Sequence, residues 1–185
     1  MRAFIAIELP QCVKEELAGL IAGLKRETVG VRWTDVRKMH LTLRFFGDIG
    51  QGLTSRVEEL VAGGFEVGGP LDLCASGLGG FPNPGRPRLI WTGVGGEVER
   101  LKTLFAALEG KLAALGVTRE ARPFTPHLTL GRADAADGVQ GFEKAKEDLS
   151  GWQGSRWRAD EVVLFESILG PGGARHVVRA RGRIL

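Results

Sequence analysis

The sequence contains no tyrosine, three histidines and only two cysteines among its 185 residues. Cys12 and Cys74 are too few and too far apart for a disulfide framework or a cysteine-based zinc motif. We therefore expect a protein of the reducing cytoplasm. No apolar run approaches the length of a membrane span, so we expect no membrane partner. The first ten residues alternate like a strand and are too briefly apolar for a signal peptide, because Glu8 interrupts them.

The sequence also has no strong excess of positive or negative charge. The net charge of +3 is far below that of a protein that coats nucleic acid along its length. The hydrophobic fraction of 43% and the charged fraction of 25% are ordinary for a globular protein. At this length we expect one domain, or two small lobes packed as one unit, and nothing in the sequence requires more than a monomer.

Two of the three histidines begin the same tetrapeptide, His-Leu-Thr-Leu, at residues 40–43 and 127–130. Alternation of polar and apolar residues is typical of a strand, in which side chains two positions apart share a face. His40 and Thr42 then point one way and the leucines the other, toward a core. The same holds for His127 and Thr129. Each motif therefore offers one imidazole and one hydroxyl on the same face of a strand.

The rest of the pattern predicts a mixed α+β chain in which strands and helices interleave. The motifs lie about half a chain apart, and each follows a helix. This spacing favours two similar lobes whose motif strands face each other across a cleft, all within one unit spanning residues 1–185. The expected strands are residues 2–8, 31–33, 40–46, 71–78, 88–94, 127–130, 158–169 and 175–185; the expected helices are 10–25, 53–65, 97–115 and 139–149; residues 79–87 are expected to form a loop.

A pair of imidazoles suits acid–base chemistry. The ordinary pKa of about 6.5 allows one ring to be neutral and the other protonated near neutral pH, so that one removes a proton and the other delivers one. The threonine hydroxyls would hold oxygens of the substrate. A metal site is the rival interpretation, but threonine is a poor ligand for transition metals and no His-x-His or Cys-x-x-Cys motif is present. We therefore expect no metal and no cofactor.

Two arginines near the motifs are candidates for contact with phosphate. Strand alternation places Arg44 on the face of His40. Arg132 lies five residues after His127, so alternation places it on the opposite face unless Gly131 makes a bulge that redirects it.

Other residues near the motifs are less clearly placed. Arg122 and Arg88 are weaker candidates for phosphate binding. Phe46 shares the parity of His40 and is therefore a candidate for a cleft wall that stacks on a base, although core packing is the favoured interpretation. His176 lacks the Leu-Thr-Leu context, and we expect it on the surface of a strand.

The paired motifs and their flanks resemble one family, the LigT-like branch of the 2H phosphoesterase superfamily. This branch comprises the RNA 2′,3′-cyclic phosphodiesterases, also called 2′-5′ RNA ligases. The resemblance runs through nearly the whole chain, in order and in spacing. The matching stretches are residues 1–7, 31–33, 39–47, 81–84, 88–91, 122–132 and 167–175. There are departures: the family often has tyrosine where this chain has His176, and leucine is common where it has Phe46.

The resemblance implies a bilobal fold of two antiparallel sheets with helices outside and a cleft between them. It implies metal-independent hydrolysis of RNA 2′,3′-cyclic phosphate ends, tRNA fragments among them, to 2′-phosphomonoesters. It also implies reversible, ATP-independent joining of RNA ends through a 2′-5′ bond. By the family pattern His40 is the general acid, His127 is the general base, and Thr42 and Thr129 hold phosphate oxygens.

Two alternatives stay open at the level of sequence. The same chemistry could act on small cyclic nucleotides or on 2′-5′ oligonucleotides. The chain could also bind RNA ends without turnover, through its arginines and aromatic side chains.

Overall fold

The computed structural model of the protein describes residues 1–83, 86–134, 139–171 and 173–185. The element order agrees with the predicted interleaving of strands and helices. The elements are β1 (Arg2–Glu8), α1 (Gln11–Glu27), β2 (Val31–Trp33), the 3-10 helix η1 (Val36–Lys38), β3 (His40–Asp48), α2 (Gln51–Ala62), β4 (Leu71–Asn83), β5 (Arg86–Gly96), α3 (Val98–Ala114), β6 (His127–Ala133), α4 (Phe142–Asp148), β7 (Trp157–Ala159), β8 (Glu161–Gly170) and β9 (Gly173–Arg183).

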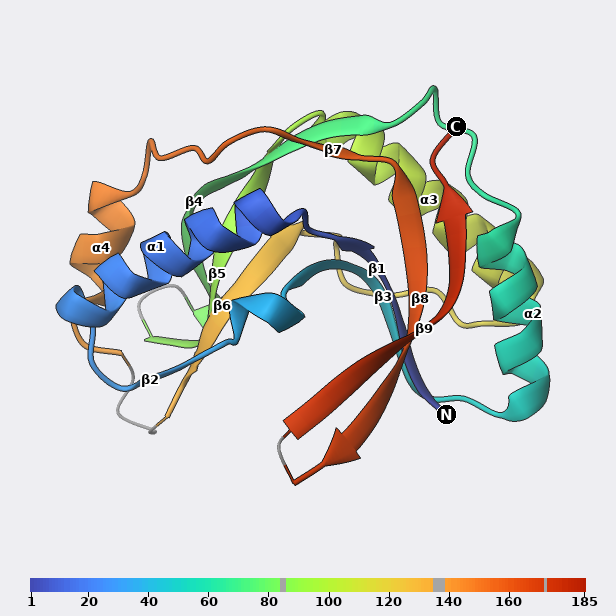
Figure 1. The fold of residues 1–185 in the computed structure, drawn as a ribbon, viewed down its shortest axis with the longest axis horizontal. Helices are drawn as coiled ribbons and strands as arrows, with labels where there is room; N and C mark the ends of the chain where they lie inside the picture. Colours follow the sequence, from blue (N-terminus) through green and yellow to red (C-terminus); the bar gives the residue numbers. More distant parts are fainter. Residues whose placement is uncertain (84–85, 135–138, 172) are drawn as a thin grey trace.

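The strands form two antiparallel sheets, one in each half of the molecule (Figure 1). The first sheet has the order β3-β1-β8-β9, and the second has the order β2-β6-β5-β4-β7. One motif strand lies in each sheet, β3 in the first and β6 in the second. The predicted bilobal α+β architecture is therefore confirmed.

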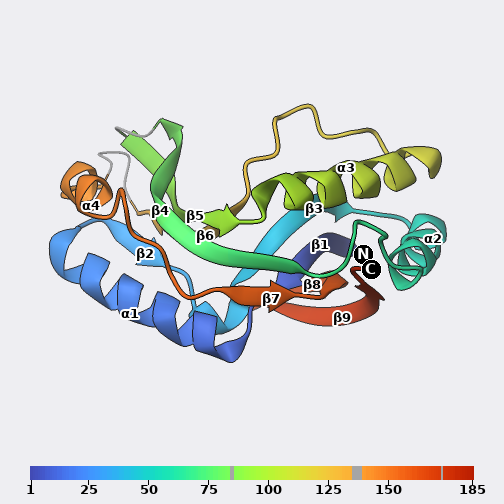
Figure 2. The same ribbon diagram turned by 90° about the horizontal axis from the view of Figure 1, so that it is seen from above.

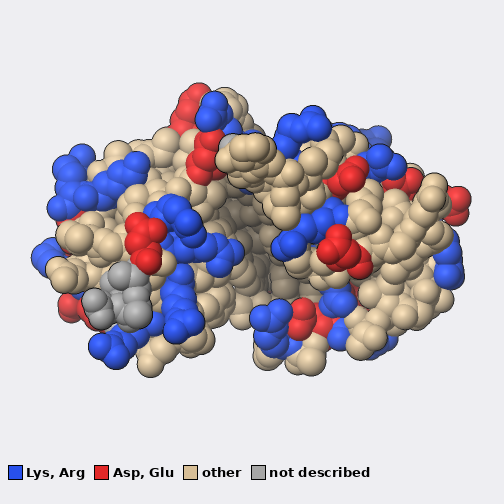
Figure 3. Space-filling model, turned by 90° about the horizontal axis from the view of Figure 1, so that it is seen from below, with Lys and Arg blue, Asp and Glu red and all other residues tan. Residues whose placement is uncertain are grey.

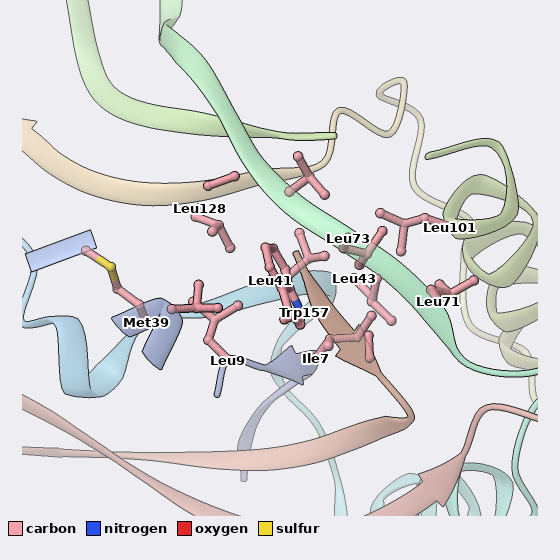
Figure 4. Close-up of a cluster of buried hydrophobic side chains, with 14 of the residues drawn as sticks. Ile7, Leu9, Met39, Leu41, Leu43, Leu71, Leu73, Leu101, Leu128 and Trp157 are labelled. Atoms are coloured by element: carbon pink, nitrogen blue, oxygen red, sulfur yellow. The ribbon is translucent and has the colours of Figure 1, made fainter. Parts of the chain in front are cut away.

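One main hydrophobic core joins the two halves. It takes buried side chains from both sheets and from α1, α2 and α3. Leu41 of β3 and Leu128 of β6 are both fully buried in it and point into the same space (Figure 4). Burying a leucine contributes about 1.5–3 kcal/mol relative to leaving it exposed. Because both motif leucines face this core, the alternating histidines and threonines lie on the other side of both strands.

The helices cover the outside of the two halves. Figures 1 and 2 show α1 and α4 together beside the five-stranded sheet, and α2 against β8 and β9 of the other sheet. The spacing of Val13, Leu17, Ile21 and Leu24 gives α1 one buried stripe, as its sequence predicts. None of the helices within the described residues is long and apolar enough to cross a membrane.

The expected loop at residues 79–87 is the main error in the predicted elements. Strand β4 continues to Asn83 and β5 begins at Arg86, while residues 84–85 lie outside the described part of the chain. Glycine usually weakens a strand, but here it makes room for a neighbour. A Cβ on Gly79 would come within 2.2 Å of the Trp91 ring, and one on Gly80 within 2.4 Å of Pro87. These glycines mark a close approach between strands.

Candidate active site

The two motif histidines occupy equivalent positions, each as the first residue of its strand. The Nδ1 atom of His40 lies 2.9 Å from the carbonyl oxygen of Lys38. The Nδ1 atom of His127 lies 2.7 Å from the carbonyl oxygen of Thr125. In both cases the partner is the residue two positions earlier, so the repeated tetrapeptide reproduces a local geometry as well as a sequence.

This contact determines which ring nitrogen carries a proton. A carbonyl oxygen only accepts hydrogen bonds, so Nδ1 of each ring must be the donor. In the neutral ring Nε2 then keeps its lone pair and can accept a proton. In the protonated ring Nε2–H can donate one. Both histidines are thus held in the tautomer that general acid–base chemistry through Nε2 requires.

The threonines lie on the same face as the histidines. Thr42 is opposite Ala6 of β1, and Thr129 is opposite Trp91 of β5. Ala6 belongs to a small cluster on the reverse face of the four-stranded sheet, separate from the main core. Figure 3 shows a hollow between the two halves, with lysines and arginines on both rims. The predicted His–Thr pairing on one face of each strand is what the register gives.

Aromatic rings enclose His40. Its ring stacks on Phe4 with centroids 4.5 Å apart and lies 6.2 Å from the ring of Phe165. This burial lowers the pKa of His40 to about 4, although the hydrogen bond to the Lys38 carbonyl opposes the shift. In the free protein His40 is therefore neutral at pH 7.

The expectation that His176 is a surface strand residue is wrong. Its ring meets the His40 ring edge-on with centroids 5.4 Å apart, and it meets Phe4 at 4.9 Å. Pairing of β9 with β8 places His176 opposite Ser167, on the face that Phe165 shares. Burial and the nearby Lys38 ammonium lower the pKa of His176. No motif marks this residue, and only the strand register brings it to the site.

His127 has different neighbours. Phe81 meets its ring edge-on with centroids 5.3 Å apart, and the Trp91 ring lies 5.9 Å away. The Trp91 side chain lies across Gly79 and lines the half of the site that belongs to the five-stranded sheet. The aromatic side chains around both histidines are the part of the site that the motifs do not predict.

A β-bulge redirects Arg132, as the sequence allows. The β5–β6 register shifts between Ile90 and Trp91, so that Gly131 pairs with buried Ile90 and Arg132 pairs with Leu89. Arg132 therefore shares the face of Trp91 and Thr129. A Cβ on Gly131 would come within 2.7 Å of Val31 and 3.0 Å of the Arg32 carbonyl oxygen, so β2 approaches closely only because this residue is glycine.

A bulge at the same point of β3 turns Arg44 away, so its expected place beside His40 is wrong. The β1–β3 register shifts between Ile5 and Ala6, which pairs Arg44 with core residue Ile5. The Arg44 guanidinium lies 3.3 Å from the Glu109 carboxylate and donates to the Thr118 carbonyl at 2.6 Å. Arg44 thus ties β3 to α3 and the segment after that helix.

Phe46 packs against the core, as its favoured interpretation predicts, and its candidate place in the cleft is wrong. A second register shift in β3 leaves Phe46 without a partner in β1, and its side chain packs against the main core. Phe45 takes its place: it pairs with Phe4, and half of it is exposed. In both motif strands the fifth residue after the histidine, Phe45 or Arg132, is therefore the one on the site face.

The remaining candidates are less directly tied to the site. Arg122 forms an ion pair with Glu120 at 3.2 Å, and its side chain is 86% exposed. Arg88 is exposed in β5. Their contact with a substrate stays a prediction. Within the described residues no group of three or more His, Cys, Asp or Glu side chains is placed to hold a metal ion.

Comparison with known proteins identifies the family. Residues 13–170 match the model of the 2′-5′ RNA ligase superfamily. This chain belongs to the 2′-5′ RNA ligase superfamily. The resemblance inferred from the motifs is thereby confirmed. A superfamily member from Methanothermobacter thermautotrophicus, named RNA 2′,3′-cyclic phosphodiesterase, is 30% identical over 94% of this chain and 93% of its own length. A protein of the same name from Thermotoga maritima is 30% identical over 94% of this chain and 90% of its own length.

Solved structures of similar proteins share the fold. Escherichia coli LigT complexed with 3′-AMP matches with a TM-score of 0.75 at 24% identity, covering 99% of this chain and 97% of its own. A Thermus thermophilus protein matches with a TM-score of 0.74 at 23% identity, covering 100% and 98%. The whole superfamily fold, with both sheets, is therefore present in this chain.

Proposed function

We propose that this chain hydrolyses RNA 2′,3′-cyclic phosphate ends to 2′-phosphomonoesters, with His40 and His127 as its acid–base pair. The observation that carries the proposal is the matched pair of histidines, each beginning a strand and each donating from Nδ1 to the carbonyl two residues earlier. The shared name of the curated relatives, RNA 2′,3′-cyclic phosphodiesterase, supports the choice of substrate.

In the proposed reaction His127 removes a proton from water, and the water oxygen attacks phosphorus. The bond from phosphorus to O3′ breaks, and His40 gives its Nε2 proton to that oxygen. The products are a 2′-phosphate and a free 3′-hydroxyl. The hydroxyls of Thr42 and Thr129 donate to the non-bridging oxygens. Each proton transfer contributes roughly 10²–10⁴-fold to the rate.

His40 must carry a proton before it can act as the acid. Burial holds its pKa at about 4 in the free protein. A phosphate anion bound beside the ring favours the charged imidazolium and raises this pKa. We therefore propose that His40 takes up its proton as the substrate binds, which restricts the acid form to the loaded site.

We propose that the same site also joins RNA ends. If the 5′-hydroxyl of a second RNA replaces water, the same proton transfers leave a 2′-5′ phosphodiester, and the cyclic phosphate supplies the leaving oxygen without ATP. The proposed partners are RNA ends of the cytoplasm, tRNA fragments among them, bound by a monomer. Neither step calls on a metal or a cofactor.

The test uses an oligoribonucleotide that ends in a 2′,3′-cyclic phosphate, incubated with the protein in EDTA. We expect full conversion to the 2′-phosphate, identified by phosphorus NMR against 2′- and 3′-phosphate standards. A 3′-phosphate product, or activity that disappears in EDTA, would contradict the proposed reaction. Adding an RNA with a 5′-hydroxyl, without ATP, tests for the 2′-5′ junction.

A further inference from the structure

A basic pocket lies beside His40, on the side away from the core. Residues of β1, α1, η1, β3, β8 and β9 surround a hollow of about 530 Å³, with His40 and His176 in its wall. Lys14, Lys38 and Arg175 also line it. None of these cations belongs to the His-Leu-Thr-Leu tetrapeptides, although Arg175 ends the matching stretch of residues 167–175, and the proposed chemistry does not use them.

The charge of this pocket is not neutralised by the carboxylates near it. Glu8 lines the pocket, but its carboxylate lies 2.6 Å from the Arg181 guanidinium. Arg37, a fourth cation of the lining, is held by Asp35 at 2.7 Å.

Among the residues that the structure describes, Lys14, Lys38 and Arg175 form no ion pair, and Lys14 donates to the Arg37 carbonyl oxygen at 3.3 Å. Lys38 and Arg175 therefore lie beside the His40 imidazole without a carboxylate in ion-pair contact, within the part of the chain that the structure describes. Lys38 does interact with Asp35, whose pKa is lowered mainly by its hydrogen bonds to Arg37 and in smaller part by the Lys38 ammonium.

The backbone fixes where Lys38 stands. Lys38 is the last residue of η1, and its carbonyl oxygen accepts a hydrogen bond from His40 Nδ1 at 2.9 Å. This hydrogen bond fixes the main chain of Lys38 relative to the His40 ring. The Lys38 ammonium lies 3.7 Å from the point that a Cβ on Gly173 would occupy, at the start of β9. Arg175 reaches the same pocket from β9. η1 and β9, which are far apart in the sequence, thus place Lys38 and Arg175 in the lining of the same pocket.

We propose that this pocket binds the phosphate on the 5′ side of the terminal nucleotide, while the cyclic phosphate lies between the two histidines. The inference rests on the proposed function and deepens it. Cations without a protein partner bind the RNA backbone irrespective of base, and phosphate contacts set the position of the strand. The pocket would thereby distinguish an RNA end from a nucleoside 2′,3′-cyclic phosphate, which lacks this second anion.

Three substrates separate the contributions. Adenosine 2′,3′-cyclic phosphate has no second phosphate, its 5′-phosphorylated form has a phosphomonoester there, and the dinucleotide ApA ending in a cyclic phosphate has a phosphodiester. We expect kcat/KM to rise about tenfold from the first to each of the other two, since charge-assisted contacts to phosphate are strong hydrogen bonds. If only the dinucleotide is favoured, the contact is with the second nucleoside and the inference is wrong.

The double variant Lys38→Gln/Arg175→Gln keeps the main-chain carbonyl that holds His40. We expect about a tenfold loss of kcat/KM on the two substrates with a second phosphate, and a change below about twofold on adenosine 2′,3′-cyclic phosphate. The matched control is Lys25→Gln, which removes an exposed cation from the last turn of α1. An equal loss on all three substrates, or no loss on any, would overturn the inference.

A binding measurement separates this inference from the proposed function. The affinity for a short RNA that ends in a 2′-phosphate is measured by fluorescence anisotropy across a range of salt concentrations. Loss of one phosphate contact lowers the slope of log K against log salt by roughly 0.7 for a single strand. We expect this change in the double variant and not in Lys25→Gln. An unchanged slope refutes the pocket even if no substrate turns over, whereas absence of turnover refutes only the proposed reaction.

Discussion

His40 and His127 head identical tetrapeptides but sit in unlike surroundings. His40 is stacked on Phe4 and met edge-on by His176, and burial lowers its pKa to about 4. His127 meets Phe81 and Trp91 on the other sheet. The two motifs are identical in sequence and give no basis for distinguishing the two rings. The difference comes from aromatic residues on other strands, which lie outside the motifs. Different surroundings allow two equivalent residues to take different roles in one reaction.

The pKa of His40 can be measured directly. In an NMR titration of the free protein, we expect the His40 ring to titrate near pH 4, because its charged form loses solvation against Phe4 and Phe165. Binding of inorganic phosphate in the site should raise this value. The variant His40→Gln assigns the resonance. A titration near 6.5 in the free protein would contradict the described surroundings of the ring, and a pKa that phosphate leaves unchanged would contradict the proposed uptake of a proton on binding.

The same shift makes stability depend on pH. In the unfolded chain the His40 ring has an ordinary pKa near 6.5, whereas in the folded protein its pKa is about 4. Between these values the unfolded state binds a proton that the folded state excludes, so the free energy of unfolding falls as pH falls. We expect the wild type to lose stability relative to His40→Gln from pH 7 to pH 4, measured by urea unfolding. A difference between the two proteins that does not change with pH would contradict this expectation.

At the scale of elements, strand alternation predicts the motif itself and fails just beyond it. His40, Thr42 and their counterparts in β6 lie on the expected face. Arg44 does not, because a bulge inserts one residue and reverses the parity of the residues after it. In β6 the corresponding bulge is foreseeable, since Gly131 offers a reason for it. In β3 the corresponding residue is not glycine, so the local sequence does not predict the register shift.

Long-range contacts explain the other errors. His176 reaches the site because β9 pairs with β8, and β8 with β1. Such pairing joins the two ends of the chain, and local periodicity carries no information about it. The glycines and prolines of residues 79–83 predict a loop, yet the ring of Trp91 across Gly79 requires a strand without a side chain there. The existence and type of the long elements are predictable from the sequence, whereas their register is not.

Replacing Gly131 with alanine tests the role of the β6 bulge. A Cβ there would come within 2.7 Å of Val31 and 3.0 Å of the Arg32 carbonyl oxygen. Overpacking of this kind typically costs about 1–3 kcal/mol of stability. We expect a loss of this size in urea unfolding. The control is Gly110→Ala, in α3, where a Cβ would meet nothing within 4 Å. An unchanged stability of Gly131→Ala would mean that β2 does not press on β6 as described.

At the scale of the whole molecule, the two halves share one core. Leu41 of one motif and Leu128 of the other lie in the same cluster (Figure 4). The site faces lie on the opposite side of the same strands, where Figure 3 shows the hollow. Packing of the motif leucines therefore helps to set the relative position of the two histidines.

A shared core predicts that the halves unfold together. Trp33, Trp91 and Trp157 belong to the five-stranded sheet, and Trp152 lies shortly before β7, so tryptophan fluorescence reports on one half. Far-UV circular dichroism reports on both. We expect the two signals to give the same urea midpoint, as for a two-state transition. Separate midpoints would show that the halves are independent units.

The proposed reaction requires the two histidines to act on one phosphorus. The decisive measurement is the single-turnover rate on an RNA 2′,3′-cyclic phosphate end in EDTA, for the wild type, His40→Ala and His127→Ala, each checked for folding by circular dichroism. We expect each substitution to lower the rate by roughly 10²-fold or more, because each removes a proton transfer. A folded variant that keeps the wild-type rate would contradict the two-histidine site.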